Sequence, residues 1–195
     1  MQNTQRNFRQ FHRKIAPIVF LPLLATAVTG VLYRIGRSGG MSGSIAGQVM
    51  SIHTGEFLGE AIVPFYVLLI GLSLVAMIVT GLTMWRSRSA PGTVSRRGSS
   101  QKLSDRKIHS KLTPILFLPL AISAVTGVIY ELGQDWFGLS PEQANFFMKI
   151  HQGSYLGSFL RVIYVLLIGA GLVALLITGI NMTGIFHRKR KSTEA

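Results

Sequence analysis

The chain contains no cysteine among its 195 residues. This absence excludes disulfide bonds, iron–sulfur clusters held by thiolates, and the C-x-x-C-H attachment of a covalent haem. Any redox group in the protein is therefore expected to be held by nitrogen or oxygen ligands, or without a covalent bond to the chain.

Acidic residues are also scarce, with 7 Asp and Glu against 20 Lys and Arg, for a net charge of +13. Most of the basic residues gather in 1–14, 86–111 and 188–191. Short segments rich in Lys and Arg mark the cytoplasmic side of a membrane protein. This distribution predicts that both termini and the 86–111 segment are cytoplasmic, and that they contact anionic lipid headgroups. Because topology accounts for the charge, we do not expect a nucleic-acid partner.

Long apolar runs are abundant, and four of them are long enough to cross a bilayer core of about 30 Å. They lie near 15–33, 61–85, 112–130 and 159–186. The first run lacks the short apolar core and small-residue cleavage site of a secretory signal, so we expect it to be a permanent span. The chain is therefore predicted to be an integral membrane protein in contact with lipid.

An internal repeat organises these runs. The stretch "FHRKIAPIVFLPLLATAVTGVLY" at 11–33 returns as "IHSKLTPILFLPLAISAVTGVIY" at 108–130, and 50–81 returns at 148–179. Two spans per copy place both copies in the membrane in the same sense. The predicted fold is all-α: a polytopic membrane four-helix bundle of two tandem two-helix repeats, related by a pseudo-two-fold axis along the membrane normal.

The repeat sets the predicted boundaries. They are 1–86 for repeat 1 (helices at about 15–35 and 55–86), 87–107 for a flexible basic linker, 108–187 for repeat 2 (helices at about 110–132 and 153–187) and 188–195 for a basic tail.

Small residues and prolines add local expectations. Pro22 and Pro119, inside the first and third spans, should kink both helices alike. The Gly- and Ser-rich segment 34–52 is predicted to be irregular, whereas Ser140-Pro141-Glu142 is typical of a helix start.

Glycines recur at matched places in the two copies. Four Thr-Gly pairs and two G-x-x-x-G motifs favour close approach of helices or of a flat ligand, with helix contact the commoner role. They are Thr29-Gly30, Thr80-Gly81, Thr126-Gly127, Thr178-Gly179, Gly55-x-x-x-Gly59 and Gly153-x-x-x-Gly157.

Four of the five histidines obey the repeat: His12 with His109, and His53 with His151. The predicted topology puts the first pair at the cytoplasmic mouth of the bundle and the second at the outer mouth. A six-coordinate haem iron accepts one imidazole on each face of the porphyrin, so each pair is a candidate for binding one haem b. The alternative is that duplication copied interfacial histidines that bind nothing.

Cations accompany the cytoplasmic pair. Arg9 with Arg106 and Lys14 with Lys111 flank the histidines and are candidates for contact with haem propionates, although the topology rule alone also explains them. Arg161, just inside the fourth span, is a candidate functional charge or a side chain that reaches the outer interface.

These motifs resemble a known family. A basic residue preceding His12, the "FLPL…AVTG" span, "IHTGEFLG" and "TGLTMWRSR" are similar to the PepSY-associated transmembrane family, over about 6–86 and 103–190. That resemblance implies a bacterial inner-membrane b-haem protein, several members being reductases linked to ferric-siderophore iron uptake, with the four repeat histidines as iron ligands. A cyanobacterial source would make the thylakoid the alternative membrane. The outer loops are too short for the PepSY domain that many members carry.

Three functions follow as hypotheses. The first is a di-haem transmembrane electron carrier, an oxidoreductase component fed by a cytoplasmic or membrane electron donor. The second is a non-catalytic accessory subunit of a larger membrane complex, and the third is a transporter, against which the midplane lacks paired charges. Against the first, the 32 residues from His53 to Trp85 predict haem levels about 48 Å apart, which is beyond one direct electron hop.

Overall fold

The computed structural model describes residues 2–88 and 100–184, with side chains omitted at a few places near these ends. The described parts are helical and contain no strand. In chain order the helices are α1 (Gln2–Ser38), α2 (Gly43–Thr54), the 3-10 turns η1 (Glu56–Leu58) and η2 (Glu60–Ile62), α3 (Val63–Arg88), α4 (Ser100–Asp135), α5 (Pro141–His151), the 3-10 turn η3 (Ser154–Leu156) and α6 (Gly157–Thr183). The predicted all-α class is confirmed.

Four of these helices are long and apolar enough to cross a membrane. The candidate spans are Thr4–Ser38, Glu60–Trp85, Leu103–Asp135 and Ser154–Thr183. Their outward faces carry large exposed apolar side chains, such as Ile18 at 71% and Ile115 at 69% exposure. Such faces suit contact with lipid, and the protein is a multi-pass membrane protein.

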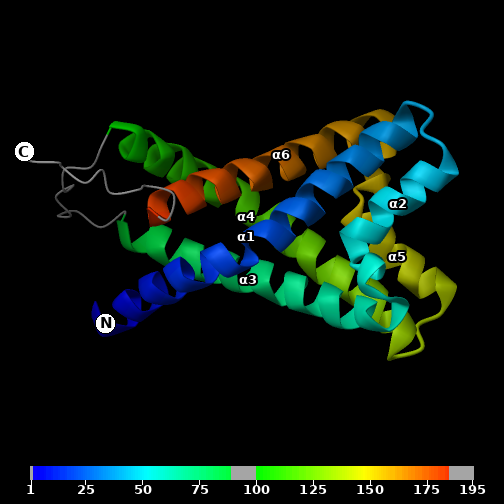
Figure 1. The fold of residues 1–195 in the computed structure, drawn as a ribbon, viewed down its shortest axis with the longest axis horizontal. Helices are drawn as coiled ribbons and strands as arrows, with labels where there is room; N and C mark the ends of the chain where they lie inside the picture. The colour runs from blue at the N-terminus through cyan, green and yellow to red at the C-terminus, as the bar shows by residue number, and fades with distance from the viewer. Residues whose placement is uncertain (1, 89–99, 185–195) are drawn as a thin grey trace, which may run out of the picture.

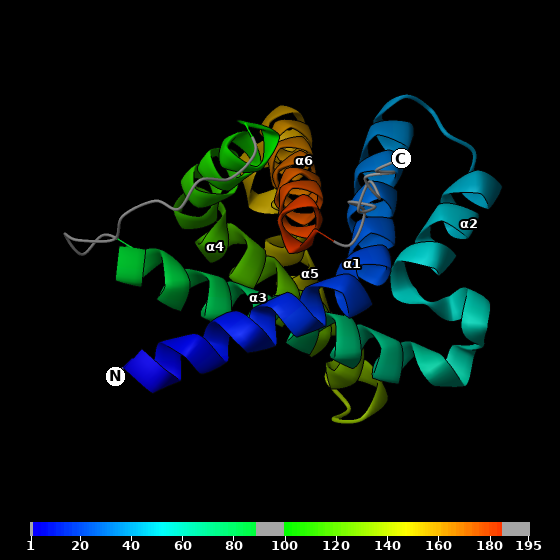
Figure 2. The same cartoon turned by 60° about the vertical axis from the view of Figure 1, so that its left-hand side comes forward.

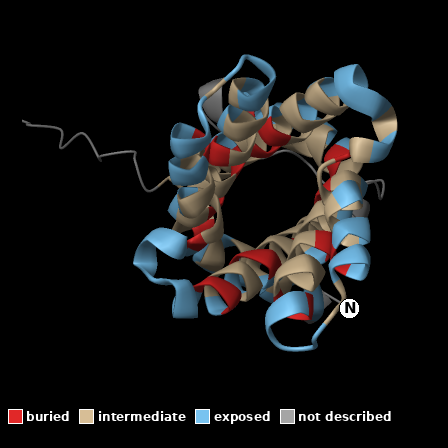
Figure 3. Cartoon of the chain, turned by 90° about the vertical axis from the view of Figure 1, so that its right-hand side faces the viewer, coloured by how far each residue is buried: buried red, intermediate tan, exposed pale blue. Residues whose placement is uncertain are grey.

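The four spans form a ring. Helix α1 packs against α3 and α6, and α4 packs against the same two helices, so α1 and α4 lie at opposite corners. Figure 3, viewed along the bundle, shows this ring with buried residues toward its inner side. The start of α1, the start of α4 and the end of α6 lie at one end, which we call the termini end (Figure 1). Helices α2 and α5 lie at the other, which we call the hairpin end.

The core between the two ends is a layer of aliphatic side chains. Leu23 of α1 and Leu120 of α4, which occupy matching places in the repeat, are 1% and 3% exposed. Leu23 packs with Val19 and Ile70, and Leu120 packs with Leu116 among others. Lipid tails are as apolar as leucine, so within the membrane these side chains stabilise the fold by close packing between helices.

Both long first helices contain internal prolines, as expected. Pro17 and Pro22 lie within α1, and Pro114 and Pro119 lie within α4. Figure 2 shows α1 changing direction part-way along its length, which agrees with a kink at a residue that cannot donate a backbone hydrogen bond.

The hairpin end corrects two expectations and confirms a third. The segment 34–52 is not irregular: α1 continues to Ser38, and α2 starts at a Ser42 cap whose side chain accepts from the Ile45 amide. The second span does not begin at 55, because α2 ends at Thr54 and α3 begins only at Val63. The prediction for Ser140 is confirmed, because its side chain caps α5 in a capping box with Gln143.

The G-x-x-x-G glycines lie where the chain reverses and not within a span. Gly55 and Gly59 have φ of +82° and +118°, and Gly153 and Gly157 have φ of +66° and +81°, with Gly157 at the first position of α6. A side chain at Gly55 would also clash with the ring of Tyr66, 2.4 Å from the position of a Cβ. These glycines reverse the chain after α2 and α5.

Several predicted boundaries also shift or lie outside the described residues. Helix α3 extends through Arg88 and α4 begins at Ser100, so both helices extend into the predicted linker 87–107. The predicted tail 188–195 and His187 lie outside the described residues. The contacts of the two halves correspond in places, as when Gly71 faces Val128 and Gly169 faces Val31. The pseudo-two-fold axis itself stays a prediction.

Candidate functional site

The hairpin-end pair consists of His53 and His151, each at the end of its short helix. Helices α2 and α5 fold back along α1 and α4 (Figure 1). The imidazoles of His53 and His151 come into contact there. The two ring centroids are 6.5 Å apart, with an angle of 71° between the ring planes. The structure therefore joins two histidines that are 98 residues apart in the sequence.

The Nδ1 atoms of this pair are committed to the backbone. His53 Nδ1 lies 2.9 Å from the Thr26 carbonyl oxygen, and His151 Nδ1 lies 2.8 Å from the Ser123 carbonyl oxygen. A carbonyl can only accept, so each Nδ1 carries the proton and donates it. The basic nitrogen of each ring is then Nε2, which is the arrangement of metal-binding histidines held by a backbone partner.

Glycine makes room for these rings. A Cβ on Gly30 would lie 3.1 Å from Cε1 of His53, and one on Gly127 would lie 3.0 Å from Cε1 and Nδ1 of His151. Both glycines belong to the predicted Thr-Gly pairs. Because glycine has no side chain, it leaves space for an imidazole at these positions. The close approach is therefore between a helix and a ring, and not between two helices.

The pKa values of the hairpin-end pair are lowered. Burial, followed by the neighbouring His151, lowers the pKa of His53 to about 4 from its usual 6.5. Burial also lowers the pKa of His151, and the hydrogen bond to Ser123 opposes this effect. Both rings are therefore neutral at physiological pH, as a metal ligand requires.

The termini-end pair consists of His12 on α1 and His109 on α4, which lie within electrostatic range of one another. His12 Nδ1 is 2.7 Å from the Thr80 hydroxyl of α3, and His109 Nδ1 is 3.0 Å from the Thr178 hydroxyl of α6. Each threonine donates its own proton to a carbonyl one turn earlier in its helix. Each hydroxyl must therefore accept from the imidazole, which again makes Nε2 the basic nitrogen.

The ring of each histidine in this pair also rests near a glycine. A Cβ on Gly81 would be 3.7 Å from Cε1 of His12, and a Cβ on Gly179 would be 3.4 Å from Cε1 of His109. Each Thr-Gly pair thus has its glycine near a histidine ring, most closely at Gly30 and Gly127. The threonines, glycines and histidines recur with the same spacing in the two copies of the repeat, and this was the signal in the sequence. The spacing alone did not show which glycine or threonine contacts which histidine.

Both levels lie on one stripe of each long helix. On α1, His12, Val19, Leu23 and Gly30 follow one another at steps of seven, four and seven residues, which keeps them on one face. From His12 to Gly30 is 18 residues of helix, or about 27 Å. The earlier figure of about 48 Å is wrong, because His53 lies on α2 and not on the helix that carries Trp85.

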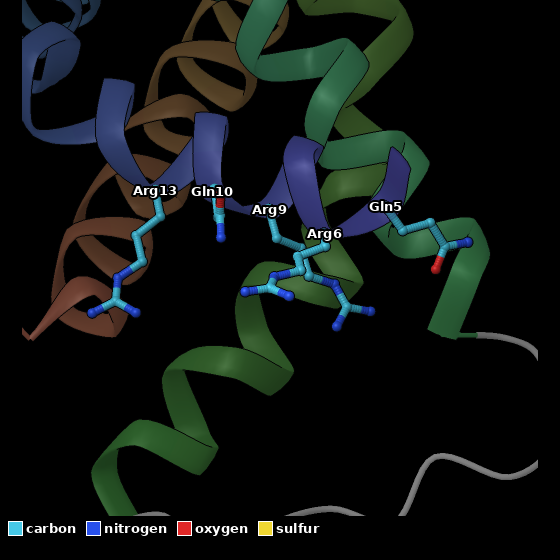
Figure 4. Close-up of a pocket in the computed structure, with 5 residues that line it drawn as sticks. All are labelled: Gln5, Arg6, Arg9, Gln10 and Arg13. Carbon is cyan, nitrogen blue, oxygen red and sulfur yellow. The ribbon is translucent and has the colours of Figure 1, made fainter. Parts of the chain in front are cut away.

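The flanking cations point elsewhere. Arg9, Lys14, Arg106 and Lys111 are all exposed. Arg9 lines a hollow of about 430 Å³ with Gln5, Arg6, Gln10 and Arg13, whose side chains extend from α1 (Figure 4). A role of these cations toward a propionate stays a prediction.

No group of three or more His, Asp or Glu side chains placed to hold a metal ion occurs in the described parts of the chain. Each histidine pair offers two nitrogen ligands. A metal held by bonds of about 2 Å between two imidazoles separates their centroids by about 6 Å, close to the spacing of the hairpin-end pair. Two axial imidazoles are what a haem iron takes from a protein, and the porphyrin supplies the other four ligands.

Comparison with known families identifies the family of the chain. The family described as the PepSY-associated TM region matches residues 35–145, which is more than half of the chain. The chain belongs to the PepSY-associated TM family. The match includes His53 and His109, one from each pair. No curated protein and no solved structure matched the chain.

Proposed function

We propose that this PepSY-associated TM protein is a b-type di-haem transmembrane electron carrier. The observation that carries the proposal is the hairpin-end pair: two neutral imidazoles, 6.5 Å apart, each oriented by an Nδ1–H bond to a carbonyl. Because Nδ1–H of each ring is bonded to a carbonyl, the basic Nε2 is the nitrogen of each ring that suits a metal. A haem iron suits the number, type and spacing of these ligands.

The chain contributes orientation and insulation. Thr26 and Ser123 fix the tautomer and the angle of the hairpin-end rings, and Thr80 and Thr178 do the same at the termini end. Haem, when bound, supplies reversible one-electron chemistry at iron. Bis-imidazole ligation uses both axial positions, which favours electron transfer over binding of a small substrate at the metal.

Two levels of histidine give the carrier its direction across the membrane. Leu23 and Leu120 fill the space between the levels and exclude water from it. The levels are about 27 Å apart along α1, measured between the His12 and Gly30 backbones. We infer that electrons enter at the termini end from a cytoplasmic or membrane donor and leave at the hairpin end.

The setting follows from the family likeness and the charge pattern. We infer a bacterial inner membrane with cytoplasmic termini, because the described basic residues at the starts of α1 and α4 lie at the termini end of the bundle. A reductase role linked to iron uptake, as in related b-haem proteins, is part of the proposal.

Purified protein tests the proposal. A reduced-minus-oxidised spectrum should show b-type bands with about two haems per chain. His53→Ala should remove one haem and His12→Ala the other, whereas Ile52→Ala, an exposed neighbour of His53, should leave both. A colourless preparation after supply of haem during expression and again after reconstitution would reject the carrier.

A colourless result would favour the accessory subunit. Large aromatic side chains are exposed at the hairpin end, including Phe137 at 75%, Phe146 at 60% and Trp136 at 46% exposure. Trp136 stacks edge-on against Phe65 of α3 at 5.4 Å. An exposed aromatic surface of this kind suits a protein neighbour in the membrane interface.

A further inference from the structure

Two arginines meet at the hairpin end of the α1–α6 edge. Arg34 lies on α1 and Arg161 on α6, near enough for their charges to interact. Both Nε atoms are buried with no hydrogen-bond partner among the described residues. Arg34 uses one terminal nitrogen on Ser38 Oγ, at 3.1 Å. Two neighbouring cations within membrane spans are unfavourable unless an anion lies between or beside them.

The opposite edge of the ring carries the opposite charge. Glu131 of α4 stands at the repeat position of Arg34, and it lies within electrostatic range of Asp135 and Glu56. Val63 stands where the repeat would match Arg161. Two halves that place their histidines alike therefore differ in charge at this end, positive along α1–α6 and negative along α3–α4.

The arginines lie beside the hairpin-end pair. Arg34 follows Gly30 by four residues, so it lies on the same face of α1, about 6 Å further along the axis. Gly30 is the residue against which the His53 ring packs. Helix α6 is held against this stretch of α1, because Gly169 contacts Val31. A flat ligand bound between the two imidazoles would therefore lie next to the stretch of α1 and α6 that carries these arginines.

We propose that Arg34 and Arg161 bind the propionate carboxylates of the haem at the hairpin-end pair, and so determine which edge of the haem faces α1 and α6. The inference rests on the proposed function. Guanidinium groups bind carboxylates through paired, charge-assisted hydrogen bonds, and both buried Nε–H groups gain an acceptor in this way. Glu131 on the far edge repels the same carboxylates. Because a histidine ligand lies on each side of the site, the haem could bind in two orientations. This charge difference selects one of them.

A lipid phosphate offers the same oxyanion chemistry, so the experiment separates the two sources. The full-length chain carrying His12→Ala, in which the hairpin-end pair alone is complete, is reconstituted with haem or with haem dimethyl ester. The ester lacks both carboxylates. Arg34→Gln with Arg161→Gln is compared with Arg37→Gln, an exposed control one turn away that donates to the Met41 carbonyl.

With haem, the double Arg→Gln variant should bind about tenfold more weakly or worse, and Arg37→Gln should bind as before. With the ester, the parent chain should already bind weakly, and the Arg→Gln changes should add less than twofold. An equal loss with haem and ester assigns the anion to a lipid phosphate and overturns the proposal. If the double Arg→Gln variant binds haem as tightly as the parent chain, the proposal about the arginines is overturned, but the proposed electron-carrier function is not. Failure of the parent chain to bind haem rejects the carrier itself.

A second measurement tests the proposal if the double Arg→Gln variant does not fold. Haem labelled with ¹³C at the propionate carboxyls is bound to the unaltered chain and to Arg161→Gln, and redox-difference infrared spectra are recorded. The carboxylate bands of one haem should shift between the two proteins. Identical bands in both proteins would contradict contact between Arg161 and a propionate.

Discussion

Replacing Gly127 by alanine tests the role of the glycine beside a histidine. The added Cβ would lie 3.0 Å from both Cε1 and Nδ1 of His151, so the ring must move by a few tenths of an ångström. That displacement acts on the 2.8 Å hydrogen bond from Nδ1 to the Ser123 carbonyl. A typical hydrogen bond contributes about 1 kcal/mol net, so its weakening should reduce haem affinity at the hairpin-end pair about fivefold to tenfold.

Gly81→Ala is the matched control. Its Cβ would lie 3.7 Å from Cε1 of His12, which is ordinary van der Waals contact. Alanine favours a helix over glycine by about 0.8–1 kcal/mol, so both variants should gain similar intrinsic helix stability. Haem titration into the haem-free protein, followed by absorbance, measures the affinity at each site, and thermal unfolding measures stability. The two variants differ only in the space left for the imidazole.

The expected pattern is weaker haem binding in Gly127→Ala and unchanged binding in Gly81→Ala. Equal binding in both variants would refute the claim that the glycine is needed to admit the ring. An equal loss in both would show that the glycines act on helix packing rather than on the histidines.

Three further predictions follow from the same contacts. Thr80→Val removes the acceptor of the His12 Nδ1–H and should weaken haem binding at the termini-end pair about tenfold to a hundredfold, measured by haem titration, with Thr80→Ser as the rescue. In the haem-free protein, burial lowers the pKa of His53 to about 4 from 6.5. The unfolded chain therefore binds this proton at a higher pH than the folded chain, so the unfolding temperature should fall as pH falls from 6.5 toward 4, and it should fall less in His53→Gln. Leu23→Ala, at 1% exposure, should cost about 2–5 kcal/mol, whereas Ile18→Ala, at 71% exposure, should cost much less, both measured by unfolding in detergent.

The repeat predicted the spans and the histidine pairs because periodicity survives drift in the surrounding sequence. The apolar runs located four membrane helices, and the Ser140 cap located the start of α5. The fold class therefore followed from hydropathy, and the candidate ligands followed from the constant spacing between the two copies of the repeat. The electrostatic contact of His12 with His109 and the ring contact of His53 with His151 agree with the predicted pairing.

The hairpin end was harder to predict. The Gly- and Ser-rich composition of 34–52 favours loops, yet packing on α1 stabilises α2, where Ala46 is 5% exposed. Tertiary contact outweighed the low helix propensity of that segment. Gly55 and Gly59 have the spacing of a packing motif, and only their backbone angles reveal turns. The partners of each Nδ1 depend on how α2 folds back, which spacing does not specify.

Electron paramagnetic resonance of the oxidised, haem-loaded protein tests the central claim most directly. Two axial imidazoles at each iron predict low-spin ferric haem throughout. The 71° between the planes of His53 and His151 further predicts a highly anisotropic low-spin signal that disappears in His53→Ala. A high-spin signal in the parent protein, or the absence of any haem signal, would contradict ligation by the histidine pairs.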